Sequence, residues 1–380
     1  MKRRLSICLF SIFLISSCHT RPQVNVNVGI NSNFSTQFRG VFDDDGYIAT
    51  ASDEGVYVLD KGKLRYVDIK SFNEATLANL NFADDNEIDA KCPENFKRYC
   101  EIADESFLQF YDNHIFYLAR KMTVEGETNY SLIRLNPDGT NRELILQIKS
   151  SPYLLTITKG YVFYVDSFTE DVFVANLNTS DTQKITFPKN HKFITFKFSE
   201  EYLYLQTYDE ANKTHHFYNY NFLTNEPTFI FSKDIQIIDG DRNNLLIYDI
   251  ISWDPLLAEM KVVNQNMELV VELVDENRHL NYLDSDFIYT SSLQGPQRYV
   301  IYDYLGNIVY DIDALEGLKV SDFIRGVYSS MEASQIQGII SNYLFVVGGA
   351  DDGIKYYLVD YKTGDWIEVF KSVSGIIDNG

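Results

Sequence analysis

The chain has 380 residues, of which 54 are acidic and 33 are Lys or Arg, so its formal net charge is −21. Such an acidic surface argues against nucleic acid as a partner and against a polybasic patch for membrane binding. Hydrophobic residues make up 45% of the chain and aromatic residues 14%, which is enough to build a large core.

Residues 1–17 have the pattern of an export signal. Three basic residues at positions 2–4 precede an apolar run over residues 5–15, which is shorter than the roughly 20 residues of a membrane-spanning helix. The run ends in Ile15-Ser16-Ser17-Cys18, an aliphatic residue, two small residues and a cysteine. This tetrapeptide resembles the lipobox of bacterial lipoproteins. The alternative is an ordinary signal peptide with a chance cysteine at its end.

The resemblance to the lipobox implies that residues 1–17 are removed and that Cys18 carries two or three acyl chains. That many buried CH₂ groups suffice for stable anchoring, whereas a single chain does not. We therefore expect a protein held by lipid at the cell envelope, outside the cytoplasm. Residue 19 is His and not the Asp that retains lipoproteins in an inner membrane, which favours the outer membrane if the host has one.

Cys92 and Cys100 remain as a pair once the signal is removed. In an oxidising compartment they would close a short disulfide loop with a structural role. Zinc is the alternative ligand, but no further Cys or His lies at zinc-ligand spacing, the closest being His114. The sequence therefore favours the disulfide.

From about residue 40 the chain repeats a unit of short strands. Seven runs follow a polar turn and are rich in aromatic and β-branched residues, as buried strands are: 47–50, 115–118, 161–165, 202–205, 245–248, 287–290 and 343–346. A second run follows each of them: 56–59, 131–135, 172–175, 217–220, 260–263, 299–302 and 356–359. Turns rich in Asn, Asp and Gly lead to third runs such as 143–146 and 366–370, and further runs such as 193–196 and 235–238 precede several of the seven.

Four strands in each of seven units, with no amphipathic helix of useful length between them, predict an all-β fold. We expect a single β-propeller of seven four-stranded antiparallel blades over residues 37–372, with six or eight blades as alternatives and 373–380 as a C-terminal tail. Residues 18–36 are a tether, unless Val24–Val28, which alternates with period two, is a strand that closes the ring.

The spacing of the units predicts two insertions. Marker residues just before the seven runs (Gly46, Asn113, Gly160, Glu201, Asn244, Asp286 and Asn342) lie 67, 47, 41, 43, 42 and 56 residues apart. A blade usually takes roughly 40–50 residues. The long first step contains Cys92 and Cys100 and the long last step contains residues 316–338. Insertions of this kind often carry specific recognition.

The segment Tyr130–Thr140 reads as a strand, an Asn-x-Asp-Gly turn and the start of another strand, and related shapes recur over residues 173–182 and 357–366. These units resemble the propeller repeats of low-density-lipoprotein-receptor-type domains and of many bacterial lipoproteins. The resemblance covers most of residues 40–371. It implies binding or scaffolding more than chemistry, and it brings no catalytic residues with it.

Candidate sites in the sequence are few. Asp239-Gly240-Asp241-Arg242-Asn243-Asn244 starts like a calcium loop, but it lacks the glycine at position 6 and the Glu at position 12, so a β-turn is expected. The histidines at 19, 114, 191, 215, 216 and 279 show no metal spacing, and the adjacent His215 and His216 must point to opposite faces of a strand. No metal site and no cofactor are expected.

Catalytic signatures are also missing from the sequence, which has no Gly-x-Ser-x-Gly elbow, no His-Glu-x-x-His and no phosphate-binding glycine loop. Trp253, expected in a loop between two strands of the fifth blade, is the candidate recognition residue. The sequence therefore favours a protein that binds or scaffolds a protein or glycan at the envelope. The alternative is a hydrolase or lyase that acts on glycans with acidic residues in the central funnel, which leaves catalysis open.

Overall fold

The computed structural model describes residues 47–370, except for 61, 81–101, 123–126, 199–202, 234, 242–243, 254–255, 265, 274–277, 284–285, 293–298, 312–335 and 351–352. Cys18, the segment Val24–Val28, Cys92 and Cys100 lie outside the described residues. All regular elements in the described residues are β-strands. None of the described segments is a helix long and apolar enough to cross a membrane.

The strands form seven sheets of four, each made of four consecutive strands paired antiparallel. The first four blades comprise β1 (Tyr47–Ser52), β2 (Gly55–Asp60), β3 (Lys63–Asp68) and β4 (Glu74–Asn79); β5 (Ile102–Tyr111), β6 (His114–Met122), β7 (Thr128–Leu135) and β8 (Glu143–Ile148); β9 (Pro152–Thr158), β10 (Tyr161–Asp166), β11 (Val172–Asn176) and β12 (Thr182–Ile185); β13 (His191–Phe198), β14 (Leu203–Asp209), β15 (Thr214–Asn221) and β16 (Glu226–Ser232). The last three comprise β17 (Ile235–Asp241), β18 (Asn244–Trp253), β19 (Leu256–Asn264) and β20 (Leu269–Leu273); β21 (Arg278–Leu283), β22 (Phe287–Ser292), β23 (Tyr299–Asp303) and β24 (Ile308–Asp311); β25 (Ile336–Ile340), β26 (Tyr343–Ala350), β27 (Gly353–Asp360) and β28 (Trp366–Val369).

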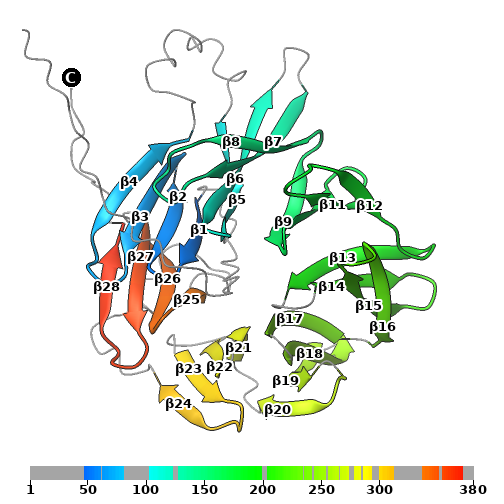
Figure 1. Ribbon diagram of the computed structural model, residues 1–380. Helices are drawn as coiled ribbons and strands as arrows, with labels where there is room; N and C mark the ends of the chain where they lie inside the picture. Colours follow the sequence, from blue (N-terminus) through cyan, green and yellow to red (C-terminus); the bar gives the residue numbers. More distant parts are fainter. Residues whose placement is uncertain are drawn as a thin grey trace, which may run out of the picture.

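The seven blades stand around a ring, with the first strand of each nearest the centre (Figure 1). The inner strands β1, β5, β9, β13, β17 and β21 lie next to one another in that order, and β25 lies beside β1. The predicted all-β propeller with seven four-stranded blades is therefore confirmed.

The core is divided into seven apolar clusters, one between each pair of neighbouring blades. Tyrosines fill much of it, and the fully buried ones include Tyr57, Tyr66, Tyr117, Tyr220, Tyr289 and Tyr299. Burial raises the pKa of Tyr220 to about 12. Stacked sheets bury both faces of each blade, which explains why the predicted strands are aromatic and β-branched throughout.

In every blade an Asp or Asn at the end of the third strand, or directly after it in the case of Asn136, starts the turn to the fourth strand: Asp68, Asn136, Asn176, Asn221, Asn264, Asp303 and Asp360. In six of these turns the side-chain Oδ1 accepts hydrogen bonds from backbone N–H groups two and three or four residues further on. An N–H near the end of each turn also donates to the carbonyl of the Asp or Asn. Side chains of this kind replace missing backbone partners and so favour turns.

The alternation of strands gives the ring two different faces. One face carries the turns from first to second and from third to fourth strands, and we name it the turn face. The other carries the turns from second to third strands and the connections between blades, and we name it the connection face. On the turn face, hydrogen bonds join the two kinds of turn in three blades. The backbone N–H of Ile69 donates to the carbonyl of Glu54, that of Leu177 to Gly160, and that of Tyr361 to Asn342.

One part of the predicted repeat is wrong in register. Residues 47–50 belong to the first strand of their blade, whereas the other six runs of the same series belong to second strands. Counted between the second strands β2 and β6, from Gly55 to His114, the first step is 59 residues long instead of 67. The step remains longer than a blade needs, because residues 81–101 connect β4 to β5.

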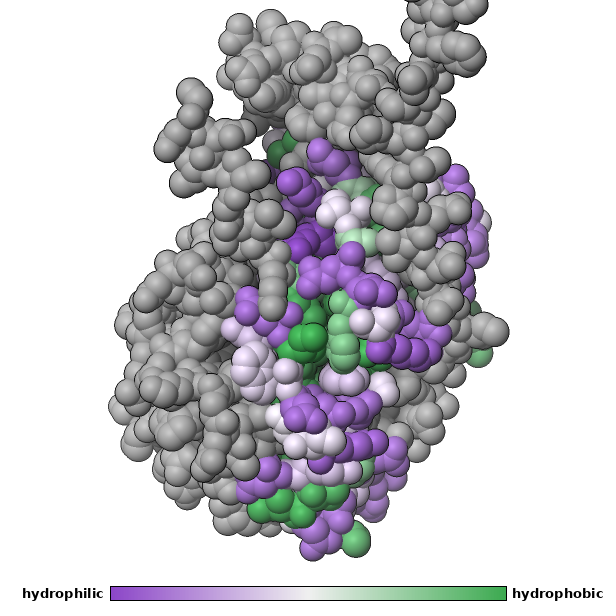
Figure 2. Space-filling model, turned by 90° about the vertical axis from the view of Figure 1, so that its left-hand side faces the viewer, coloured by the Kyte–Doolittle hydropathy of each residue, from purple (hydrophilic) through white to green (hydrophobic). Residues whose placement is uncertain are grey.

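Within the described residues, the ring closes between the first and last blades without a shared strand, since each of these blades has four strands of its own. Side chains of both blades form one apolar cluster, which includes Val56, Val67, Phe345 and Phe370. Figure 2 shows this side of the molecule, where hydrophobic residues are visible between hydrophilic ones. Closure in the described residues therefore depends on packing and on side-chain hydrogen bonds.

Candidate functional site

Three side chains of the fourth blade converge at its end on the connection face: His191 at the start of β13, Asp209 at the end of β14 and His216 near the start of β15. Strand pairing places them together. His191 is opposite Asp209, and His216 is opposite Thr207, so the three side chains share one face of the sheet. That face packs against the third blade.

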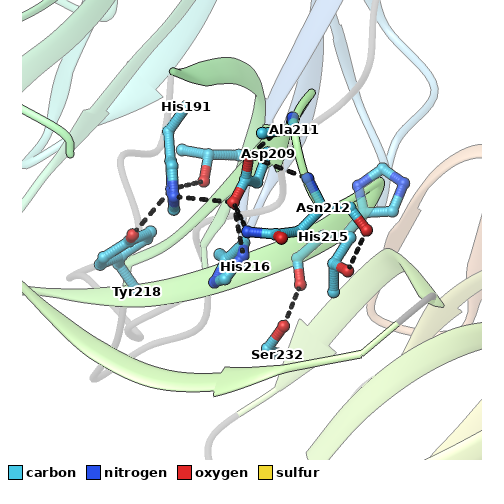
Figure 3. A network of polar contacts seen from close by, with 10 residues as sticks. His191, Asp209, Ala211, Asn212, His215, His216, Tyr218 and Ser232 are labelled. Carbon is cyan, nitrogen blue, oxygen red and sulfur yellow. Dashed lines mark hydrogen bonds and ion pairs between the residues drawn. The ribbon is translucent and has the colours of Figure 1, made fainter. Parts of the chain in front are cut away.

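The cluster is largely shielded from solvent. The side chains of His191, Asp209 and His216 are 9%, 10% and 19% exposed. Asp209 Oδ2 lies 3.8 Å from Nε2 of His191 and 4.0 Å from Nε2 of His216 (Figure 3). These distances are too long for direct hydrogen bonds. The His216 Nε2 atom is buried and makes no hydrogen bond in the described part of the chain.

Hydrogen bonds hold Asp209 and His191 in these positions. Asp209 Oδ1 accepts from the backbone N–H of Ala211 at 2.9 Å and of Asn212 at 3.3 Å, and Oδ2 accepts from Nδ2 of Asn212 at 2.6 Å. On the far side of His191, Nδ1 lies 3.2 Å from Thr207 Oγ1 and 3.1 Å from the hydroxyl of Tyr218. The His191 ring and the Asp209 carboxylate are therefore oriented by their neighbours.

The charges of the cluster are set by its surroundings. The hydrogen bond from Asn212 lowers the pKa of Asp209, and the two backbone N–H donors and His191 act in the same direction. Burial lowers the pKa of His191, and His216 lowers it further, while Asp209 opposes both. The cluster is thus one carboxylate facing two imidazoles, of which His191 is biased towards its neutral form near pH 7.

This set of groups has two chemical uses. Neutral imidazole and carboxylate are ligands for divalent transition metals, and a histidine next to a carboxylate is also able to exchange protons. Among the described residues, this is the one group of three or more His, Cys, Asp or Glu side chains with such geometry. Asp209 is likewise the one acidic residue among the buried polar residues of the described part.

The residues singled out in the sequence lie elsewhere. Cys18, Cys92 and Cys100 fall outside the described residues, so lipidation and the disulfide stay predictions. Trp253 is the last residue of β18 and pairs with Leu256 of β19, so its expected place in a loop is wrong, and its role in recognition stays a prediction. The turn expected at Asp239–Asn244 is confirmed, because Asp241 and Asn244 pair across the β17–β18 hairpin.

Spacing along the chain does not reveal the cluster, because its three residues come from three different strands. The predicted orientation of His215 and His216 is confirmed, since His215 pairs with Tyr208 and His216 with Thr207 on the opposite face. The signal lay in strand pairing. Asp209 pairs with Thr214 across the turn, so His216, two residues on, returns to the face of Asp209.

One exposed aromatic residue on the connection face was also missed. Phe168 lies in the β10–β11 turn of the third blade and is 82% exposed. Two large apolar residues are similarly exposed on the turn face, Leu223 at 95% and Leu305 at 85%. Single exposed apolar residues are ordinary, so exposure alone does not distinguish the two faces.

No protein-family model and no curated protein sequence matches the chain. Solved structures do. The β-propeller domain of the Trilobed protease from Pyrococcus furiosus, described as having an open velcro topology, has a TM-score of 0.50 and 13% identity; the match covers 69% of this chain and 81% of that one.

Two other similar structures are also enzymes by name. Dipeptidyl peptidase 4 from Porphyromonas gingivalis gives a TM-score of 0.49 and 7% identity over 88% of this chain and 60% of that one. An oligogalacturonate lyase in complex with manganese gives a TM-score of 0.47 and 12% identity, and the match covers 67% of this chain and 76% of that one. At these identities, the likeness to solved structures shows the propeller fold and nothing about activity.

Proposed function

We propose that the chain is a lipid-anchored propeller of the cell envelope that binds or scaffolds a protein or glycan through its connection face. The observation that carries this proposal is the position of the two long connections. Residues 81–101 leave β4 and enter β5, residues 312–335 leave β24 and enter β25, and all four strand ends lie on the connection face. Blade-to-blade connections elsewhere in the ring are much shorter.

Long connections on one face of a rigid scaffold are typical of recognition surfaces. The β25 strand begins at Ile336, so the insertion predicted over 316–338 is residues 312–335 in the structure. Phe168 and the His191 cluster add an exposed aromatic ring and a polar group to this face. The turn face, by contrast, carries seven short turns between third and fourth strands that are built alike.

Membrane anchoring rests on the resemblance of residues 15–18 to the lipobox, and the propeller repeats resemble those of low-density-lipoprotein-receptor-type domains, which also bind partners. A lipid on Cys18 would hold the ring close to the bilayer, because the first described strand begins only 29 residues further along the chain, at Tyr47. No observation favours the alternative, a glycan hydrolase or lyase, over binding: among the side chains whose burial is described, Asp209 is the one buried carboxylate.

Site-specific photo-crosslinking in the native host tests the proposal. A photoreactive residue replaces Glu210, exposed in the β14–β15 turn on the connection face, or Leu223, exposed in the β15–β16 turn on the turn face. We expect a discrete crosslinked partner from position 210 and none from position 223. Adducts from position 223 alone, or from neither position, would contradict the proposal.

A further inference from the structure

The His191 cluster holds three ligand-type atoms around a common point. The three ligand atoms all lie within 4.8 Å of one another. Atoms so arranged lie within about 2.8 Å of a shared centre, whereas zinc bonds to nitrogen and oxygen are about 2.0–2.2 Å long. Inward movements of well under 1 Å, within reach of small side-chain rotations, would bring all three atoms to bonding distance.

The hydrogen-bond pattern leaves one ring nitrogen of each histidine facing that centre. For His191, the hydroxyls of Thr207 and Tyr218 lie within hydrogen-bond distance of Nδ1, so Nε2 is the nitrogen left to face Asp209. The His216 Nε2 atom is buried without a hydrogen bond, which is costly unless a proton or cation satisfies it.

We propose that His191, Asp209 and His216 bind a divalent first-row transition-metal ion such as Zn²⁺. Two imidazole nitrogens and one carboxylate oxygen suit these ions, whereas Ca²⁺ and Mg²⁺ require oxygen ligands. Three protein ligands leave at least one coordination position for water or another ligand. This inference goes beyond the proposed partner binding and does not depend on it.

The supporting shell has the form that metal sites need. Thr207 and Tyr218 orient one imidazole, while Asn212 and the backbone N–H of Ala211 orient the carboxylate. A carboxylate oxygen has two lone pairs, so Oδ2 is able to accept from Asn212 and still bind a metal. The ion would tie the starts of β13 and β15 to the end of β14, so binding would stabilise the fourth blade.

Zinc binding by the full-length, detergent-solubilised protein tests this, with stoichiometry measured by equilibrium dialysis and elemental analysis after chelation. His216→Ala removes one ligand. Its matched control is His215→Ala, the adjacent histidine on the opposite face of β15. We expect the wild type and His215→Ala to bind one more zinc ion per chain than His216→Ala. Comparing variants accounts for any zinc held by Cys92 and Cys100.

A second variant guards against misfolding. Asp209→Asn keeps the Oδ1 atom that accepts from the turn, as Asn176 and Asn221 do in turns at the ends of third strands, but removes the negative charge. We expect it to keep the wild-type circular dichroism spectrum and to lose at least about 100-fold in zinc affinity. Zinc should raise the Tm of the wild type and of His215→Ala only. Equal zinc stoichiometry and equal Tm shifts in His215→Ala and His216→Ala would overturn the proposal.

Discussion

Arg65 in the first blade donates from Nη1 to the carbonyl oxygen of Phe370 in the last blade at 3.1 Å, across 305 residues of chain. The backbone N–H of Phe370 in turn donates to Oε1 of Glu74 at 2.7 Å, and Nη2 of Arg65 lies 3.4 Å from the other carboxylate oxygen. The Phe370 ring is buried beneath the guanidinium, 5.2 Å away. These contacts join the first and last blades where the ring closes.

Replacing Arg65 should therefore weaken the whole ring. We expect Arg65→Ala to lower the free energy of unfolding by about 1–3 kcal/mol, since hydrogen bonds to charged groups contribute about this much. Arg65→Lys should recover only part of the lost free energy of unfolding, because an ammonium group cannot donate to both partners with the same geometry. Urea denaturation measures both. Lys70→Ala, which removes an exposed ion pair with Glu54, is the control and should change stability by less than about 1 kcal/mol.

Gln109 joins the second and third blades. Its buried side chain donates from Nε2 to the carbonyl of Ile157 at 2.9 Å and accepts from the N–H of the same residue at 2.8 Å. Gln109→Leu would leave both backbone groups unpaired, and we expect a loss of about 2–4 kcal/mol in thermal or urea unfolding. Gln147→Leu, at an exposed position of β8, should change stability little. Similar losses in both variants would argue against the inter-blade bond.

Stability should fall in acid partly through Asp68. Burial alone would raise the pKa of its carboxyl, but hydrogen bonds from Ser71 and Lys70 outweigh burial and hold the pKa below its ordinary value. A lowered folded-state pKa means that Asp68 stabilises the fold above the unfolded-state pKa of about 3.9, and that this contribution is lost as pH falls through the folded-state value.

The variant Asp68→Asn should accordingly reduce the dependence of unfolding free energy on pH. Asn occupies the same turn position at Asn176 and Asn221, so the turn itself should be kept. Urea denaturation at pH 7 and pH 3 measures the difference. We expect a smaller difference between the two pH values in Asp68→Asn than in the wild type, and an unchanged difference would contradict this role of Asp68.

Membrane attachment is tested at Cys18. If that residue is acylated, the wild type should incorporate radiolabelled palmitate and sediment with membranes, while Cys18→Ala should do neither. Cys92→Ala serves as a control, because removing a structural thiol should not alter lipid labelling. Equal labelling of the wild type and Cys18→Ala would exclude lipidation at this residue.

The number of blades and most strands were predictable because hydrophobic patterning is local. Runs such as 161–165 and 217–220 lie inside β10 and β15, where both faces are buried and alternation gives way to continuous aromatic and β-branched residues. The exception at Tyr47 has a simple reason. Inner and second strands have the same composition, so their order is decided by pairing with neighbours, which a single run of letters does not report.

The site was less predictable. The relation between Asp209 and His216 follows from one turn, but His191 reaches them only through the β13–β14 register, which shifts between Phe193 and Thr195. A bulge of this kind moves every later residue relative to its partner, and no residue in the sequence marks it. The low-density-lipoprotein-receptor-type resemblance stays a prediction, as do the lipid and the disulfide.

The seven Asp and Asn residues that end the third strands have a further consequence for how this molecule could vary. Six of those turns are held by hydrogen bonds from their own backbone N–H groups to the Asp or Asn side chain, all on the turn face. Lengthening a connection on the connection face costs little free energy, because loop-closure entropy grows only slowly with loop length. The turn face thus keeps the shape of the blades, while the connection face is able to take new sequence. Binding loops could be grafted at residues 81–101 or 312–335 without rebuilding a blade.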